Sequence, residues 1–361
     1  MPPRGEPGLD TPALAIDLDA LERNLRQMAD FFAPLPCALR PHAKTHKCVE
    51  IARRQIELGA VGITCAKLGE AETMADGGIS DILIANQVTA PGKLARLARL
   101  AGRCTLTVAI DDLENANAIA AAAREAGTRA GVLIEVDTGM GRCGLAPEPG
   151  AVARFCRRVA DLNGLSFRGL MGYEGHAVLV EDPDERRAKA EKAARLLLEC
   201  AGAVRDAGLQ VTVVSAGGTG TYDTTGRLGG ITEIQAGSYC LMDARYRRVR
   251  PEFDNALFLI ATVVSRPTAE RVVLDCGMKA ITREFGLPIV LDPPGLELVH
   301  LSEEHGACRV AQPTCALRPG DQVRLLPTHC CTTVNLHGRY WVVRDGRLVE
   351  TWPIAARGRF D

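Results

Sequence analysis

The sequence predicts an α/β protein in which a (β/α)8 barrel is followed by a second, mostly β domain. The first observation is size: the chain has 361 residues, 47% of them hydrophobic, enough to bury the cores of a barrel and of a further domain. The second is that short apolar runs alternate with amphipathic stretches from about residue 18 to residue 245. The third is that short runs broken by Pro, Gly and Asp take over after residue 250.

Eight strand-like runs lie in the first part of the chain, and seven helical crossovers are visible between them. This number, over a length close to the ~250 residues typical of the fold, favours a closed barrel. An open, doubly wound sheet is the alternative, because periodicity does not decide whether a sheet closes. The runs are CALRPH (37–42), VGITCA (61–66), DILIAN (81–86), TLTVAI (105–110), GVLIEVD (131–137), SFRGLMGY (166–173), VTVVSA (211–216) and ITEIQA (231–236).

The clearest predicted helices are LARLARLAG, ENANAIAAAAREAG and the long RRAKAEKAARLLLECAGAVRDAG. In the second part, ALFLIATVVSRP, ERVVLDCG, DQVRLLP and RYWVVRDGRLVETWPI predict short strands. The run TPALAID at 11–17 precedes the first helix and is compatible with either domain. We assign residues 18–245 to the barrel, and residues 1–17 and 246–361 to the β domain.

Charge and composition exclude several classes of partner. Lys and Arg number 43 against 44 Asp and Glu, so no overall field attracts nucleic acid or an anionic membrane surface. The N-terminal segment has no apolar core after its positive charge, and no run approaches the ~20 apolar residues of a membrane span. With 13 cysteines, an odd number without CxxC pairs, the thiols are expected to be reduced. We therefore expect a cytoplasmic protein.

The residues that follow the first predicted strand include a candidate nucleophile. Working residues of such barrels lie at the C-terminal ends of the strands, and this strand leads into RPHAKTHK at 40–47. A desolvated lysine among other cations has a lowered pKa and can form a Schiff base, which makes Lys44 the candidate. A solvated basic turn is the more common role of a lysine in such a segment.

Four further strand ends carry polar groups or glycine-rich turns. The fifth run leads into DTGMGRCG, with Arg142, and the sixth into GYEGH, with Tyr173, Glu174 and His176. A buried, hydrogen-bonded Tyr or His is the alternative role for that segment. The seventh and eighth runs lead into SAGGTGT (215–221) and GSY (237–239). Glycine-rich turns on the last two strands favour a phosphate site, because their backbone N–H groups are free to bind it.

The segment PTHCCTTVN at 327–335 contains a possible metal-binding pair. If it is extended, His329 and Cys331 share one face of the strand and Cys330 lies on the other. An imidazole beside a thiolate suits Zn²⁺ or a similar ion. Two protein ligands leave an open site completed by water and substrate, which is typical of catalytic metals.

Taken together and in order, the motifs resemble one known group. They are TPALAIDLDALERNL, RPHAKTHK, DTGMGRCG, GYEGH, SAGGTGTY, EIQAGSYCLMDARY and PTHCCTTVNLH, and they cover nearly the whole chain. The chain resembles the metal-activated pyridoxal-phosphate enzymes of the D-threonine aldolase and D-serine dehydratase family. Their barrel is related to that of alanine racemase, which is called fold type III.

The resemblance implies a role for each matching residue. Lys44 would hold pyridoxal phosphate as a Schiff base, Tyr173 would face the pyridine nitrogen, and Arg142 would lie near the ring and its 3-oxygen. His176 would act near the substrate. The residues implied to bind the phosphate are Gly218, Thr219, Gly237, Ser238 and Tyr239. His329 and Cys331 would hold the divalent metal beside the β-hydroxyl of a D-β-hydroxy amino acid. The family also implies a homodimer.

Two reactions share these residues. Loss of the hydroxyl proton leads to aldol cleavage into glycine and an aldehyde, whereas loss of the Cα proton and of hydroxide leads to a keto acid and ammonia. The pair His329 and Cys331 resembles the dehydratases, since the aldolases mostly carry His-x-Asp, but the other motifs look closer to the D-threonine and 3-hydroxy-D-aspartate aldolases. We expect an aldolase. The thiolate favours zinc, with manganese or cobalt as alternatives.

Other classes fit less well. An amino-acid racemase on the same barrel would need no metal, so the pair His329 and Cys331 counts against it. A non-catalytic carrier of pyridoxal phosphate would need only the barrel. A metallohydrolase would place histidines and carboxylates at the strand ends, where few of the seven histidines lie. Arg245 stands where the family has an acidic residue, so substrate recognition is expected to differ.

Overall fold

The structure, a computed structural model, describes residues 9–312 and 316–361, which form two compact units. One, here called the barrel unit, holds the parallel strands and most of the helices. The other, here called the β unit, holds the remaining strands. The barrel unit consists of residues 27–44, 49–237 and 358–361, and the β unit of the described residues of 1–26, 45–48 and 238–357.

Eight parallel strands form the sheet of the barrel unit, in the order β2-β9-β8-β7-β6-β5-β4-β3. The end strands are also joined, because the N–H of Val61 donates to the carbonyl of Leu39 and that of Thr64 to Pro41. The sheet therefore closes into a barrel, and the open-sheet alternative is excluded. All eight predicted strands are present. They are β2 (Ala38–Leu39), β3 (Ile63–Cys65), β4 (Asp81–Ile84), β5 (Thr105–Ile110), β6 (Ala130–Glu135), β7 (Leu165–Met171), β8 (Val213–Ala216) and β9 (Glu233–Ile234).

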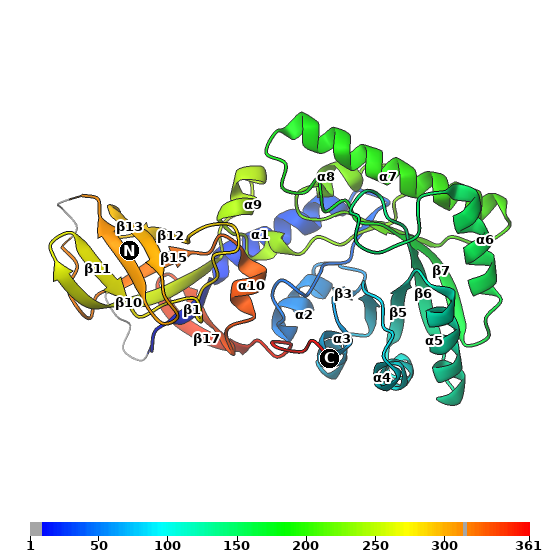
Figure 1. The fold of residues 1–361 in the computed structure, drawn as a ribbon, viewed down its shortest axis with the longest axis horizontal. Coiled ribbons are helices and arrows are strands. Elements are labelled where there is room, and N and C mark those ends of the chain that lie inside the picture. Colours follow the sequence, from blue (N-terminus) through cyan, green and yellow to red (C-terminus); the bar gives the residue numbers. More distant parts are fainter. Residues whose placement is uncertain (1–8, 313–315) are drawn as a thin grey trace. The chain divides into compact units, whose positions relative to one another are not determined.

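Amphipathic helices lie along the outside of these strands (Figure 1). α5 begins where the Asp112 carboxylate accepts the N–H of Asn115 at 2.8 Å, and α7 begins in the same way at Asp182. The helices, including α1, which spans both units, are α1 (Leu18–Phe32), α2 (Val49–Glu57), α3 (Leu68–Asp76), α4 (Pro91–Ala101), α5 (Leu113–Glu125), α6 (Pro149–Ala160), α7 (Pro183–Asp206) and α8 (Tyr222–Thr225).

The interior of the barrel has an apolar layer and a polar one. Alternate residues of a barrel strand point inward, and on β4 to β7 these form a buried apolar cluster of Leu83, Ala109, Leu133 and Met171. Asp81 and Glu233, the first residues of β4 and β9, both bind Arg40. Its guanidinium lies 2.6 Å from Asp81 Oδ1 and 2.8 Å from Glu233 Oε2. The polar layer is therefore at the N-terminal ends of the strands.

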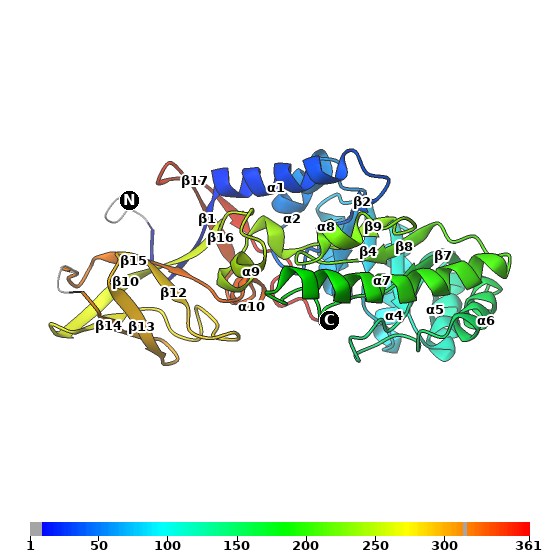
Figure 2. The same cartoon turned by 90° about the horizontal axis from the view of Figure 1, so that it is seen from above.

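The β unit is built on a sheet in the order β13-β14-β11-β10-β1-β16-β17, to which β15 and β12 are joined through β10. Figure 2 shows β1 beside β16, with which it pairs. The run at 11–17 forms β1, which pairs antiparallel with β10 and parallel with β16. The strands are β1 (Ala13–Asp17), β10 (Leu257–Thr268), β11 (Arg271–Leu274), β12 (Ile289–Asp292), β13 (Leu296–Leu301), β14 (Gly306–Val310), β15 (Gln322–Leu326), β16 (Arg339–Arg344) and β17 (Arg347–Pro353). The β unit also contains three short helices, of which two precede β10 and one lies between β15 and β16: the 3-10 helix η1 (Ser238–Cys240), α9 (Ala244–Val249) and α10 (Cys330–Val334).

Two further properties of the described residues bear on the sequence analysis. None of the helices described is both long and apolar enough to cross a membrane. None of the described cysteines forms a disulfide, and most of them are buried.

Candidate cofactor and metal sites

Three predicted residues from separate parts of the chain meet around the ring of a fourth, Tyr173, which follows β7. The Lys44 Nζ lies 5.8 Å from the centroid of this ring, and the Arg142 guanidinium carbon lies 5.6 Å from it. A Cβ on Gly218 would lie 3.3 Å from the edge of the same ring. Since these residues follow β2, β6, β7 and β8, the structure gathers them at the C-terminal ends of the strands.

The glycine loop after β8 is fixed by Glu174, a residue to which the sequence analysis gave no role. Its side chain is buried, at 2% exposure. Its carboxylate accepts the N–H of Gly217 at 3.1 Å and the hydroxyls of Thr221 and Thr225 at 2.8 and 2.6 Å. Gly217 has a φ of +77°, in the left-handed region that favours glycine. The loop is thereby shaped without a bulky side chain beside Tyr173, which fits a bound phosphate.

The other predicted phosphate residues lie on both sides of a unit boundary. Gly237 is in the barrel unit, as are Gly218 and Thr219, whereas Ser238 and Tyr239 are in the β unit. Both of the latter are buried in η1, where the Tyr239 ring packs against Phe253 at 5.9 Å between centroids.

A buried carboxylate also accompanies Arg142. Glu135, the last residue of β6, accepts a hydrogen bond from the Gln87 side chain at 2.6 Å, and its other oxygen lies 3.8 Å from an Arg142 nitrogen. Burial raises the pKa of Glu135, although Gln87 and Arg142 act in the opposite direction. Arg142 itself is half-exposed. It therefore lies between a buried anion and the Tyr173 ring.

His176 lies against the loop that carries Arg142. A Cβ on Gly139 would lie 3.1 Å from the imidazole Cε1 of His176. The loop is held by Asp137, whose carboxylate accepts the N–H groups of Gly139, Met140 and Gly141. Burial opposes ionisation, but these bonds and His176 lower the pKa of Asp137 overall. His176 thus brings the segment after β7 into contact with the loop after β6.

The two residues predicted to bind a metal, His329 and Cys331, lie close together, but the extended conformation predicted for their segment is wrong. Cys330 begins the helix α10, and His329 is its N-cap residue. The cause is Asp243, whose carboxylate accepts the N–H of Cys330 at 3.0 Å. The ligand atoms of His329, Cys330 and Cys331 nevertheless all lie within 4.8 Å of one another.

Asp243 also orients the imidazole. The Nδ1 of His329 lies 3.2 Å from Oδ2 of Asp243, which is fully buried. With Nδ1–H donating to this carboxylate, the lone pair of Nε2 is available to a metal. The same residue is the N-cap of α9, where its carboxylate accepts the N–H groups of Arg245 and Tyr246. A sequence signal existed, since an Asp directly before a helix is a common cap.

The electrostatics of the pair suit a divalent cation. Burial lowers the pKa of His329, but Asp243 and Cys331 raise it to about 10. Against burial, Cys330 and His329 lower the pKa of Cys331 well below its usual value. The Cys331 sulfur also forms a hydrogen bond with the Thr45 hydroxyl at 3.4 Å. The site thus stabilises a thiolate and a positive charge beside it, and this nitrogen and sulfur donor set is one that Zn²⁺ prefers.

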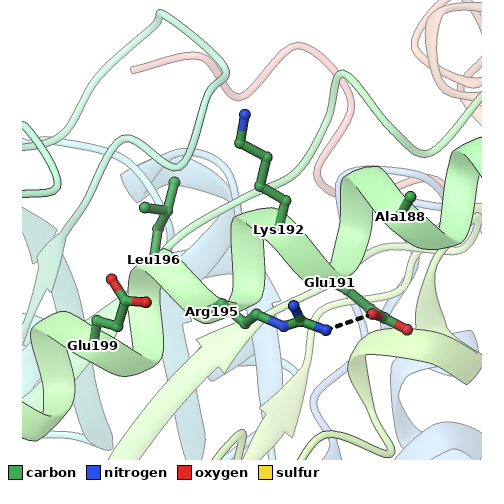
Figure 3. A pocket seen from close by; sticks show the side chains of 6 residues that line it. All are labelled: Ala188, Glu191, Lys192, Arg195, Leu196 and Glu199. Atoms are coloured by element: carbon green, nitrogen blue, oxygen red, sulfur yellow. Dashed lines mark hydrogen bonds and ion pairs between the residues drawn. The ribbon is translucent and has the colours of Figure 1, made fainter.

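A hollow on the outer helix α7 contains none of these residues. It measures about 320 Å³ and is lined by side chains of α7 alone, among them the ion pair of Glu191 and Arg195 (Figure 3). Its position on one helix, away from the strand ends, sets it apart from the site around Tyr173.

Known proteins match nearly the whole chain. The model of the alanine racemase N-terminal domain matches residues 16–244, and that of a putative serine dehydratase domain matches residues 256–343. The chain is 40% identical to a D-threonine aldolase from Arthrobacter sp. over 99% of its length and 97% of the relative. It is 34% identical to a D-threo-3-hydroxyaspartate dehydratase from Delftia sp., over 95% of its length and 97% of the relative. The solved structure of D-threonine aldolase from Filomicrobium marinum matches with a TM-score of 0.94 and 41% identity, covering 97% of this chain and 96% of that one.

Proposed function

Since the chain belongs to the D-threonine aldolase and D-serine dehydratase family of alanine-racemase-like enzymes, we propose that it cleaves D-β-hydroxy amino acids to glycine and an aldehyde. Enzymes of this family are pyridoxal-phosphate-dependent lyases. The observation that carries the proposal is the meeting of Lys44, Arg142 and the glycine loop around Tyr173 at the strand ends. The higher identity to an aldolase than to a dehydratase, 40% against 34%, supports cleavage of the carbon–carbon bond.

The residues around Tyr173 have the chemistry that pyridoxal phosphate requires. When bound, this cofactor supplies an electron sink for the bond that breaks at Cα. In the proposal Lys44 binds it covalently, Tyr173 faces its pyridine nitrogen, and Arg142 lies beside its 3-oxygen. Glu135 holds the charge of Arg142 in place at 3.8 Å. The proposed phosphate ligands are Gly218, Thr219, Gly237, Ser238 and Tyr239.

The metal in this proposal is Zn²⁺, bound by Nε2 of His329 and the sulfur of Cys331. It would make the β-hydroxyl of the substrate more acidic. The hydrogen bond of His329 to Asp243 holds the imidazole in the tautomer that a metal needs. His176, which lies against the Asp137 loop, is the proposed group that moves a proton near the substrate.

Dehydration is the second candidate, and one observation favours it. Position 331 is a cysteine, as in the dehydratases that the sequence resembles, instead of the aspartate that most aldolases carry. In that case Lys44 removes the Cα proton and hydroxide leaves from Cβ, which gives a keto acid and ammonia.

Product analysis tests the proposal. The purified protein is supplied with pyridoxal phosphate and Zn²⁺ or Mn²⁺ and incubated separately with D-threonine, D-serine and 3-hydroxy-D-aspartate. The expected products include glycine, with acetaldehyde from D-threonine. A keto acid with ammonia would replace the proposal by the dehydratase, and formation of the enantiomer alone would indicate a racemase.

The state of the molecule in the cell is a further part of the proposal. We infer a homodimer, as the family resemblance implies, working in the cytoplasm with a small-molecule substrate. Light scattering of the eluting protein would measure the dimer mass. A monomer that turns over substrate would contradict this part alone.

A further inference from the structure

A second hollow opens at the opposite end of the barrel from Tyr173. It measures about 730 Å³ and is lined by residues at the N-terminal ends of β4 to β7. Its volume lies within the ~300–1,000 Å³ usual for small-molecule sites. The polar side chains that line it are those of Ser80, Arg103, Thr105, Arg129, Ser166 and Arg168.

The position of Arg168 depends on a β-bulge. Val132 of β6 pairs with Phe167 of β7, but the next residue, Leu133, pairs with Gly169, so Arg168 is an extra residue in β7. Its side chain extends past β6 to β5, where its NH1 donates to the Thr107 hydroxyl at 2.8 Å.

Gly131 of β6 leaves the space for this side chain. A Cβ on Gly131 would lie 2.9 Å from Cδ of Arg168 and 2.8 Å from the Thr107 oxygen. The bulge and the glycine together bring a guanidinium from β7 to the mouth of the barrel.

Two of the three arginines at this mouth, Arg129 and Arg168, carry positive charge that no carboxylate of the described residues neutralises. Within residues 9–312 and 316–361, neither Arg129 nor Arg168 forms an ion pair. The Nε of Arg129 donates to the carbonyl of Leu165 at 2.8 Å, which leaves its charge uncompensated. Asp81 pairs with Arg40, and Asp76 pairs with Arg103, the third arginine of the lining.

The apolar layer inside the barrel separates this hollow from the cofactor residues. Leu83, Ala109, Leu133 and Met171 are at most 2% exposed and lie on the same four strands, nearer their C-terminal ends. An anion bound at the hollow would therefore not be the phosphate of the cofactor.

We propose that the hollow binds a small dianion, a phosphate or a dicarboxylate, through Arg168 and Arg129. The planar guanidinium matches both groups, because its N–H donors form paired, charge-assisted hydrogen bonds with two oxygens. The hydroxyls of Thr105 and Ser166 at the same mouth supply further donors.

Isothermal titration calorimetry of the cofactor- and metal-loaded enzyme tests the site, with inorganic phosphate in one arm and succinate in the other. We expect one-site saturable binding in at least one arm, and the arm that saturates identifies the anion class. Arg168→Gln should weaken it by at least about tenfold, the equivalent of about 1.4 kcal/mol. Arg195→Gln, on the outer face of α7, is the matched control and should leave the affinity unchanged.

Two further variants show whether a loss of affinity in Arg168→Gln comes from the lost contact or from misfolding. Arg168→Lys keeps the charge but loses the paired geometry, so its affinity should fall between those of the parent and Arg168→Gln. Arg129→Gln changes an exposed side chain and should also weaken binding. Absence of saturable heat in both arms, or equal affinity in the parent, Arg168→Gln and Arg129→Gln, would overturn the proposal.

Discussion

Glu174 is a single residue on which the shape of the glycine loop depends, because its buried carboxylate accepts three hydrogen bonds from that loop and the adjoining helix. Glu174→Gln replaces one acceptor oxygen by an amide NH₂. Facing Gly217, the NH₂ meets an N–H that it cannot bind; facing the two threonines, it can donate to their hydroxyl oxygens but no longer accepts their hydroxyl hydrogens. Leaving a buried donor without a partner costs about 1–3 kcal/mol. We expect a lower midpoint of urea unfolding and an affinity for pyridoxal phosphate reduced about tenfold, measured by fluorescence titration.

The matched control for this change is Glu199→Gln, at an exposed position of α7. It should leave both quantities unchanged. Cofactor affinity in Glu174→Gln equal to that of the parent would show that the loop keeps its shape without this carboxylate.

Asp243 has a similar role at the metal pair, since one carboxylate holds the His329 ring and the first N–H of α10. Both groups share Oδ2, while Oδ1 accepts the N–H groups of Arg245 and Tyr246, so the amide of Asp243→Asn faces either the first pair or the second and leaves that pair without its acceptor. Because outer-shell partners of metal-binding histidines contribute about 10- to 100-fold to affinity, we expect a loss of that size. Competition with a chromophoric chelator measures it.

Glu303→Gln, exposed in the β unit, is the control for the loss of a negative charge. The absorbance of bound pyridoxal phosphate should remain in both variants. Unchanged Zn²⁺ affinity in Asp243→Asn would refute the orienting role.

At the scale of elements, the strands of the barrel follow from local sequence and α10 does not. The runs DILIAN, TLTVAI and GVLIEVD are rich in β-branched residues and bounded by turns, so the local sequence is enough to predict each strand. Cys330 to Val334 contains poor helix formers, and the helix begins there because Asp243, 87 residues away in the chain, accepts the N–H of Cys330. The strands β12 to β14 were not among those predicted, since the alternation in LELVHL is imperfect.

In the candidate site, too, some residues were predictable from the local sequence and others were not. Lys44, Arg142, Tyr173 and Gly218 were predictable because each follows a strand, and parallel strands of a barrel end on one side. Their supporting groups depend on distant partners. Glu135 meets Gln87 across 48 residues, and a single sequence carries no signal for such a pair.

The start of α5 offers a stability test that does not involve the site. Asp112→Ala removes the side chain that caps the N–H of Asn115. Loss of such a cap costs about 1 kcal/mol, so the urea midpoint should fall while turnover stays the same. Glu125→Ala, at the exposed end of the same helix, should change the free energy of unfolding by less than about 0.5 kcal/mol. Equal effects of the two changes would argue against the cap.

At the scale of the whole molecule, the residues proposed for cofactor and metal belong to different units. Lys44 and Tyr173 are in the barrel unit, and His329 and Cys331 are in the β unit. Lys44→Ala should therefore lose the visible absorbance of the bound cofactor and keep its metal content. His329→Ala should keep the absorbance and lose the metal together with metal-dependent turnover.

Absorbance spectra and elemental analysis of the two purified variants check this separation. Covalently bound cofactor in Lys44→Ala, or full activity in metal-stripped His329→Ala, would contradict the assignment. Treatment of the parent with a chelator should reproduce the behaviour of His329→Ala.

The closure of the barrel has a consequence for the order in which the protein folds. Arg40 and Glu233, which bind each other where the ring closes, are 193 residues apart in the chain. During synthesis β2 therefore emerges long before β9, with which it pairs, and until then one edge of β2 stays unpaired. Such late, long-range pairing is slow because a long loop must close first. We therefore expect the nascent chain to be most prone to aggregation before β9 has emerged.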